Sequence, residues 1–164
     1  MTEFLDGPQG RRIAYNRLEG QGPCVLFLGG FRSDMQGTKA VWLEDWARRR
    51  GQAFLRFDYS GHGESAGAFE DGCIGDWLAD ARAVLERLMP GPVVLVGSSM
   101  GGWISLLLAR EMGARVAGLV TVAAAPDFTE RGFWTEMSAA QREELLSAGR
   151  VLRPSDYDEP YVIT

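Results

Sequence analysis

The sequence predicts an α/β fold in which a mostly parallel sheet carries helices on both faces. Three observations support this fold class. A hairpin pattern opens the chain, short apolar runs then alternate with longer segments of helical spacing, and glycine-rich loops follow the apolar runs. The composition, 46% hydrophobic and 24% charged residues over 164 positions, is ordinary for a globular domain and sufficient for a core.

The first half of the chain contains four predicted strands. Thr2–Asp6 and Arg11–Leu18 flank the turn sequence G-P-Q-G and predict a β-hairpin. Cys24–Leu28 and Ala53–Phe57 are short apolar runs that predict buried strands. The second of these runs is followed by the glycine-punctuated loop D-Y-S-G-H-G-E-S, in which we expect Asp58 to hold the loop by hydrogen bonds rather than to act in catalysis.

Two helices are predicted between these strands and the centre of the chain. Thr38 is a candidate N-cap for a helix that runs to Arg50 and stops at Gly51, with an inner face formed by Trp42, Leu43, Trp46 and Ala47. The second helix begins at Ile74, carries an apolar stripe to Leu88 and ends before Pro90-Gly91. Its tryptophan, Trp77, is expected in the core.

The most informative stretch is Val93–Trp103, which reads V-V-L-V-G-S-S-M-G-G-W. Four apolar residues predict a buried strand, and the G-x-S-x-G pattern centred on Ser99 leads directly into a helix. This is the arrangement of a nucleophile elbow, in which the serine sits on a tight strand-to-helix turn. Such a turn requires small residues at Gly97 and Gly101 because neighbouring chain comes close. A plain turn with a solvated serine is the alternative.

The last predicted strand of the sheet is Arg115–Ala125, after which the pattern changes at Pro126. Ser138 and Gln141 form a capping box that opens a short helix, and the last fifteen residues are polar and predicted to be irregular. We therefore interpret residues 1–164 as one partial domain. Its core sheet and helices occupy 1–125, and a connecting or cap region begins at 126–164.

Bulk properties exclude several classes of function. The net charge of −5, the pI near 4.9 and the absence of a basic patch argue against nucleic acid as a partner. The sequence has neither a secretory signal pattern nor an apolar run of the ~20 residues that a membrane span needs. Cys24 and Cys73 lack metal or redox spacing, so we expect free thiols and a cytoplasmic location. Lys39 is the only lysine beside 16 arginines, a bias typical of GC-rich, bacterial coding sequences.

Three motifs resemble the α/β-hydrolase superfamily, and within it the branch of acyl-protein thioesterases and acyl-glucuronide esterases. They are F-L-G-G-F-R-S-D-M-Q-G-T-K-A at Phe27–Ala40, R-F-D-Y-S-G-H-G-E-S at Arg56–Ser65, and V-G-S-S-M-G-G-W at Val96–Trp103. With the helix at Ile74–Leu88, the resemblance extends to about Ala125. The Q-G-T-K-A stretch is more distinctive than the serine motif alone.

The resemblance implies a role for three residues. Ser99 is the acyl-accepting nucleophile, and the backbone N–H groups of Met100 and Phe31 form the oxyanion hole. The sequence departs from many family members at Gly29, where they have histidine before the oxyanion glycine. No metal and no organic cofactor is implied, and the expected substrate is a small acyl ester or thioester. The resemblance points to fatty-acyl thioesters or acyl glucuronides.

A serine triad also needs a base and an acid, and in this family they follow the serine in the order Asp, His. The only histidine, His62, precedes Ser99 and matches a structural position of the G-H-G loop, with an unorthodox base as the alternative. Asp127 follows the strand after the elbow, a position that some relatives use for the acid, although a turn residue is the alternative.

We therefore expect that the triad Asp and His and the C-terminal strands of the fold lie beyond residue 164. The chain is then a fragment, a truncated product or half of a complex. The strand at 116–123 would leave an apolar parallel edge, which we expect to be covered by the missing portion, a separate segment or another copy. The leading hypothesis is a serine esterase or thioesterase. The alternative is an inert half-domain that binds an acyl ligand or a partner chain through that edge.

Overall fold

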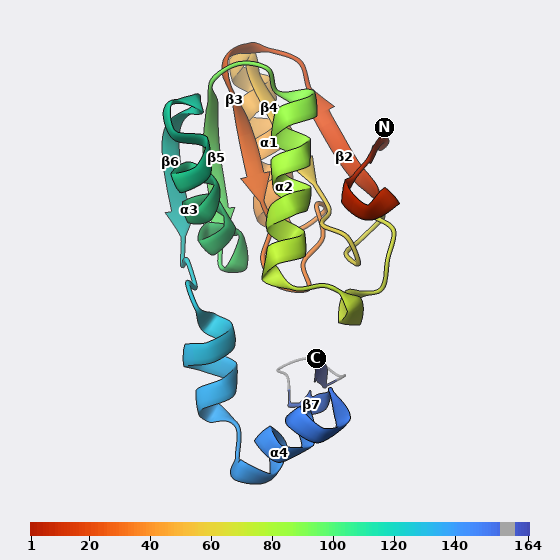
Figure 1. Ribbon diagram of the computed structural model, residues 1–164. Coiled ribbons are helices and arrows are strands. Elements are labelled where there is room, and N and C mark those ends of the chain that lie inside the picture. Colours follow the sequence, from red (N-terminus) through yellow and green to blue (C-terminus); the bar gives the residue numbers. More distant parts are fainter. Residues whose placement is uncertain (155–159) are drawn as a thin grey trace. The chain divides into compact units, whose positions relative to one another are not determined.

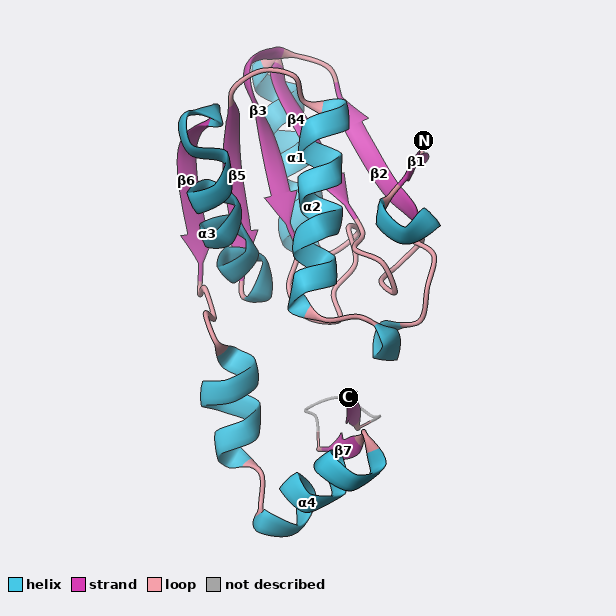
Figure 2. Cartoon of the chain, viewed as in Figure 1, coloured by secondary structure: helices cyan, strands magenta, loops and turns pink. Residues whose placement is uncertain are grey.

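The computed structural model describes residues 1–154 and 160–164. The chain divides into two compact units, Met1–Pro126 and Asp127–Thr164, and each is described by itself (Figures 1 and 2). Among the described residues, no helix combines the length and the apolar character needed to cross a membrane.

The first unit is built on a six-stranded sheet with the order β1-β2-β4-β3-β5-β6. The two N-terminal strands pair antiparallel and β2 joins β4 antiparallel, whereas the β4-β3, β3-β5 and β5-β6 pairs are parallel. This confirms the α/β class with a mostly parallel sheet. The strands are β1 (Glu3–Asp6), β2 (Arg12–Leu18), β3 (Gln21–Leu28), β4 (Gln52–Phe57), β5 (Val93–Ser98) and β6 (Val116–Val122).

Helices cover both faces of the sheet. Helix α1 (Thr38–Arg50) lies on one face, and α2 (Ile74–Leu88) and α3 (Met100–Met112) lie side by side on the other (Figure 1). Successive strand residues point to opposite faces. The core on the α1 side accordingly contains every second strand residue, namely Val25, Phe27, Phe54 and Val96, packed against Ala40 and Ala47. The residues between them, Leu26, Leu28, Leu55 and Leu95, are fully buried in the other layer.

Helix α2 has the bounds that its apolar stripe predicts, and Trp77 is buried as expected. Helix α1 differs in two details. Gly37 is the N-cap rather than Thr38, because the first helical bond runs from the Val41 N–H to the Gly37 carbonyl. Trp42 is 59% exposed rather than on the inner face. At about 100° per residue, Trp42 is rotated about 100° around the helix axis from Leu43, which packs against the core.

The strand bounds differ from the sequence prediction by more than one residue at two places, and by one residue at the starts of β1, β2, β4 and β6. Strand β3 begins at Gln21 instead of Cys24, because Gln21 already pairs with Gln52 across a register shift. Strand β6 ends at Val122 instead of Ala125, because Ala123 turns the chain with a φ of 47°. Before it, Gly113–Arg115 forms a 3₁₀ turn, as do Pro8–Gly10 in the hairpin and Phe69–Asp71 before α2.

Strand β6 is the last strand of the sheet order, and it pairs with β5 alone among the described strands. Its side chains are largely exposed, with Leu119 at 38% and Val120 at 50%. The prediction that this edge is covered in the assembled protein stays a prediction. Cys24 and Cys73 are both free thiols, and burial raises the pKa of the Cys24 thiol to about 11.

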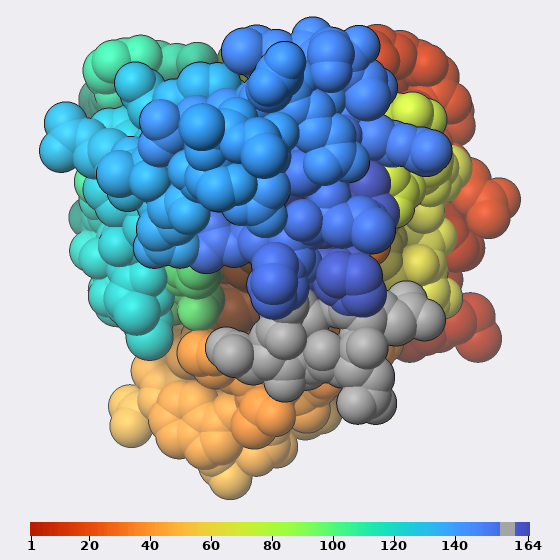
Figure 3. Space-filling model, turned by 90° about the horizontal axis from the view of Figure 1, so that it is seen from below, coloured from red at the N-terminus to blue at the C-terminus, as the bar shows by residue number. Residues whose placement is uncertain are grey.

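The second unit contains a π-helical segment (Phe128–Trp134), helix α4 (Ala139–Ala148), and the strands β7 (Val151–Arg153) and β8 (Tyr161–Ile163). The predicted capping box is confirmed, since Ser138 and Gln141 exchange hydrogen bonds of 3.0 and 3.2 Å. The prediction of an irregular tail was wrong for Val151–Arg153 and Tyr161–Ile163, because β7 and β8 pair antiparallel; its part at 155–159 lies outside the described residues. Figure 3 presents this unit in blue as a space-filling surface.

Candidate active site

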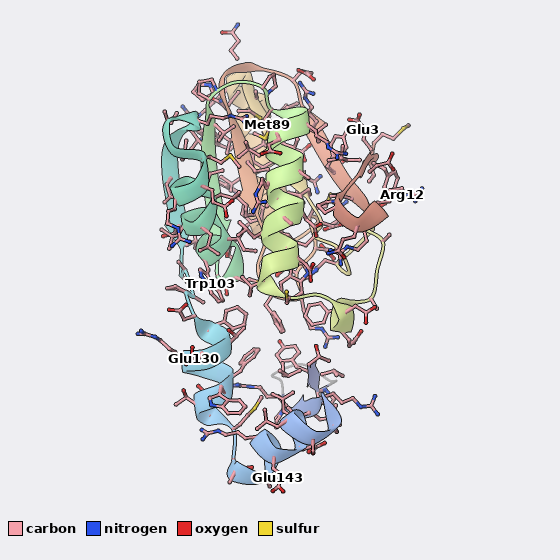
Figure 4. All side chains as sticks on the ribbon, in the orientation of Figure 1. Glu3, Arg12, Met89, Trp103, Glu130 and Glu143 are labelled. Carbon is pink, nitrogen blue, oxygen red and sulfur yellow. The ribbon has the colours of Figure 1, made fainter. Side chains whose placement is uncertain are left out.

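Ser99 occupies a sharp turn between β5 and α3, where its φ of 53° and ψ of −119° lie in a region that favours glycine. Trp103, in the first turns of α3, marks the elbow end of the helix layer, and Met89 marks the opposite end at the close of α2 (Figure 4). The carboxyl ends of the parallel strands meet at the elbow end. Ser99 itself is partly exposed there.

The two glycines of the G-x-S-x-G pattern are required by close backbone contacts. A Cβ at Gly101 would lie 2.1 Å from the Leu28 carbonyl oxygen and 2.4 Å from that of Gly29. A Cβ at Gly97 would lie 2.3 Å from the Gly101 carbonyl oxygen. The elbow therefore presses against the end of β3, which is the physical reason for the small residues predicted at these positions.

Backbone hydrogen bonds hold the strained serine from both sides. The Ser99 N–H donates to the Val122 carbonyl at 2.9 Å. The Ser99 carbonyl accepts from the Gly102 N–H at 2.9 Å and from the Ala125 N–H at 3.2 Å. Strand β6 and the residues after it thus fix the elbow, and the side chain of Ser99 is presented on a rigid backbone.

One predicted oxyanion donor follows this serine in the chain, and the other follows a glycine that lies close to it. Met100 is the first residue of α3, where N–H groups have no acceptor within the helix and the helix dipole favours negative charge. Phe31 follows Gly30, and a Cβ built at Gly30 would lie 3.4 Å from the Ser99 Cβ. The backbone that leads into Phe31 is therefore in contact with the elbow.

The loop that carries Phe31 is held at its far end by two buried charged residues. Asp58 accepts from the Met35 N–H at 2.6 Å and from the Glu64 N–H at 2.8 Å, which confirms its predicted role in holding the loops. Arg56 donates to the Met35 carbonyl, to Gln36 at 2.9 Å, and to Glu44 of α1. Burial raises the pKa of the Asp58 carboxyl, although the two amide hydrogen bonds offset part of the rise.

His62 is built into an aromatic cluster. Its ring makes edge contacts with Tyr59, Phe69 and Trp77 at centroid distances of 5.1 to 5.6 Å. Its Nδ1 lies 3.1 Å from the Ser60 carbonyl oxygen, and its buried Nε2 has no hydrogen-bond partner among the described residues. Burial lowers the pKa of His62 below its ordinary range. These contacts favour the structural role predicted for His62 over that of a base.

Sequence reasoning missed a buried polar network centred on Ser60. Asp80 of α2 is fully buried and accepts from the Ser60 N–H at 2.9 Å and the Ser60 hydroxyl at 2.7 Å. The Ser60 carbonyl accepts from the Trp77 indole N–H at 3.1 Å. Burial raises the pKa of the Asp80 carboxyl. The sequence held a signal for the burial of Asp80, because Asp80 lies three residues after Trp77 and therefore on the apolar face of the same helix.

Asp127 is the N-cap of the π-helical segment in the second unit. Its carbonyl accepts from the N–H groups of Glu130 and Arg131, and its carboxylate lies 3.8 Å from the Arg131 guanidinium. These contacts are those of a turn residue. Within residues 1–154 and 160–164, no group of three or more His, Cys, Asp or Glu side chains is arranged to hold a metal ion.

The first unit thus belongs to the class of α/β proteins with a mostly parallel sheet, and in it a strained serine at a strand-to-helix turn lies beside a glycine-rich loop from the neighbouring parallel strand. A sequence model described as "Alpha/beta hydrolase family" matches residues 25–162. The chain belongs to this family.

Individual relatives refine the comparison. The chain is 38% identical over 156 residues to the mitochondrial palmitoyl-protein thioesterase ABHD10 of Bos taurus, covering 95% of this chain and 51% of that protein. It therefore spans about half the length of the curated relatives it matches. Among solved structures, a putative hydrolase from Agrobacterium vitis S4 has a TM-score of 0.92 at 40% identity, over 100% of this chain and 68% of the other. Mouse alpha/beta hydrolase domain-containing protein 10 has a TM-score of 0.86 at 34% identity, over 96% and 63%.

Proposed function

We propose that the chain carries the nucleophile half of a serine hydrolase that cleaves acyl esters or thioesters in the cytoplasm. The observation that supports this most directly is the backbone of Ser99, a non-glycine residue held at φ 53° and ψ −119°. Strained serines of this kind are a feature of nucleophile elbows. The thioester class is supported by the relatives named palmitoyl-protein thioesterase.

In the proposed reaction, the Ser99 Oγ attacks the acyl carbonyl carbon, and the carbonyl π electrons move onto oxygen. The N–H groups of Met100 and Phe31 donate hydrogen bonds to this oxyanion. Collapse of the tetrahedral intermediate expels the alcohol or thiol and leaves an acyl-serine. Water then attacks the acyl-serine, and the carboxylic acid is released.

A base must take the serine proton and return it to the leaving group. His62 is a poor candidate because its ring is enclosed by aromatic side chains and its pKa is lowered by burial. Asp127 pairs with Arg131 at a turn. We therefore propose that the histidine base and the triad acid are supplied by residues outside these 164. Without a base, activity should fall on the order of 10⁴–10⁶-fold.

The test is an intact mass measurement on the natively expressed protein, before and after exposure to a fluorophosphonate. We expect one adduct, which Ser99→Ala abolishes and the matched control Ser98→Ala retains. Turnover of acyl thioesters and oxygen esters of equal chain length then ranks the substrate classes. An unmodified wild-type protein would contradict the proposal.

The competing hypothesis is a non-catalytic binding half-domain. It is favoured by one observation, the exposed apolar side chains of β6 at the end of the sheet. A binding module forms no covalent adduct, and its ligand affinity is indifferent to Ser99→Ala. The same two variants therefore separate the hypotheses.

A further inference from the structure

The segment of the oxyanion loop between Gly30 and Met35 is anchored at its two ends in different ways. At the near end, Gly29 and Gly30 pack against the elbow through backbone contacts. At the far end, Asp58 and Arg56 bind the N–H and the carbonyl of Met35. Phe31, whose N–H is the proposed oxyanion donor, lies between these anchors in a turn that the Ser33 N–H closes by donating to the Gly30 carbonyl at 3.1 Å.

The residue after Phe31 adopts a strained conformation. Arg32 has a φ of 56°, which costs a non-glycine residue free energy unless its surroundings hold it there. The Phe31 N–H, the proposed donor, belongs to the peptide group between Gly30 and Phe31, and only the Phe31 residue separates this peptide from the Arg32 backbone torsion. A change in the Arg32 backbone would therefore rotate the chain next to the donor. The contacts of the Phe31 and Arg32 side chains thus affect the direction of the Phe31 N–H.

Both side chains rest on one short segment, Phe69–Glu70. The Phe31 ring makes an edge contact with the Phe69 ring at a centroid distance of 4.9 Å. The Arg32 guanidinium lies 4.6 Å above the same ring, and one of its nitrogens is 3.6 Å from the Glu70 carboxylate. Phe69 thus contacts the residue that carries the donor and the residue that follows it.

Phe69 is itself supported by the buried network beneath it. Its ring stacks on Trp77 at a centroid distance of 5.5 Å and contacts His62 at 5.1 Å. Trp77 and His62 both bond to the Ser60 carbonyl, and Ser60 is held by Asp80. Ser60, Trp77, His62 and Asp80 each make at least one hydrogen bond within this network, which packs beneath the Phe69 ring.

We propose that Phe69 is a positioning residue, which aims the Phe31 N–H at the developing oxyanion by clamping the Phe31 and Arg32 side chains. This inference rests on the proposed function and adds to it a residue that acts through the contacts of Phe31 and Arg32. Loss of one oxyanion donor costs roughly 10²–10³-fold in kcat. Misaiming a donor that is still present costs less, and we expect a loss of about 10- to 100-fold for Phe69→Ala.

The experiment uses the natively expressed protein, with rates expressed per site titrated by the fluorophosphonate. Phe69→Ala is compared with Phe69→Tyr, which retains the ring, and with Phe4→Ala as the matched control. Phe4 also lies under a guanidinium, 4.0 Å from Arg12, and it is 42% exposed on β1. The readouts are kcat, KM and the affinity for an alkyl trifluoromethyl ketone, whose adduct with the serine places an oxyanion in the hole.

We expect Phe69→Ala to lower kcat and ketone affinity by the same factor at constant KM, with Phe69→Tyr and Phe4→Ala close to wild type. If Phe69→Ala folds poorly, Phe69→Leu keeps the volume without the ring face and should show the same loss per titrated site. If the wild-type protein is labelled and active, and Phe69→Ala or Phe69→Leu has the same kcat as the wild type, the positioning role of Phe69 is refuted and the proposed function is not. A wild-type protein without an adduct at Ser99 would overturn the proposed function and the clamp with it.

Discussion

Substitution of Gly101 by alanine tests whether contact between the elbow and strand β3 dictates the glycine. The added Cβ would lie 2.1 Å from the Leu28 carbonyl oxygen, whereas ordinary contact begins at 3.4 Å. Helix α3 and strand β3 would have to separate by roughly 1.3 Å to relieve this. Because both sides of the contact are backbone, no rotamer change can absorb it.

The magnitude follows from two opposing effects. Overpacking in a tight core costs about 1–3 kcal/mol, and a clash between two backbones belongs at the upper end of that range. Replacing glycine by alanine inside a helix returns about 0.5–1 kcal/mol. We therefore expect Gly101→Ala to lower the free energy of unfolding by about 2 kcal/mol, and the fluorophosphonate to label Ser99 more slowly.

The matched control is Gly75→Ala in the first turn of α2. A Cβ there meets only the Cys73 sulfur, at 3.6 Å, so we expect a gain of up to about 1 kcal/mol. Urea unfolding followed by tryptophan fluorescence measures both variants. Equal unfolding free energies for Gly101→Ala and Gly75→Ala would refute the argument from backbone contact.

Two further predictions concern the buried polar groups beside the elbow. Asp58→Ala leaves the N–H groups of Met35 and Glu64 without their acceptor. Because each unsatisfied group costs about 1–3 kcal/mol, we expect the free energy of unfolding in urea to fall by about 3 kcal/mol. A fall of less than about 1 kcal/mol would contradict the two hydrogen bonds. His62 has a lowered pKa in the folded state, so on acidification the unfolded chain takes up its proton first, and the stability of the wild type falls as the pH drops through 6.5 toward the lowered value. The wild type should therefore lose stability relative to His62→Phe between about pH 8 and about pH 5, and a relative gain would show that the sign is wrong.

The sequence predicted the elements whose signal is periodic and local. Helix α2 has its predicted bounds because its apolar stripe repeats through four turns and Pro90 follows it. The tight turn at Ser99 was predicted because steric contacts within that one turn require glycine at positions 97 and 101. The family resemblance added candidate roles for Ser99, Met100 and Phe31, which remain predictions.

What the sequence did not predict depends on partners distant in the chain. Asp80 and Ser60 are joined by a hydrogen bond across 20 residues of sequence, and the local sequence around either residue does not indicate the other as its partner. Trp42 was placed inside because its residue type is apolar, although its angular position puts it in solvent. Strands β7 and β8 have three residues each, too few for alternation to distinguish a strand from an irregular segment.

The backbone of Ser99 has a consequence for how sequence change would act on this protein. Glycine is the residue that a φ of 53° and a ψ of −119° favour, so replacing the serine by glycine would relieve strain rather than cause it. Selection for stability alone would therefore favour glycine over serine at this position. The serine at position 99 lowers the stability of the fold relative to glycine. Its presence therefore supports a chemical role for the hydroxyl, and this support does not depend on any relative.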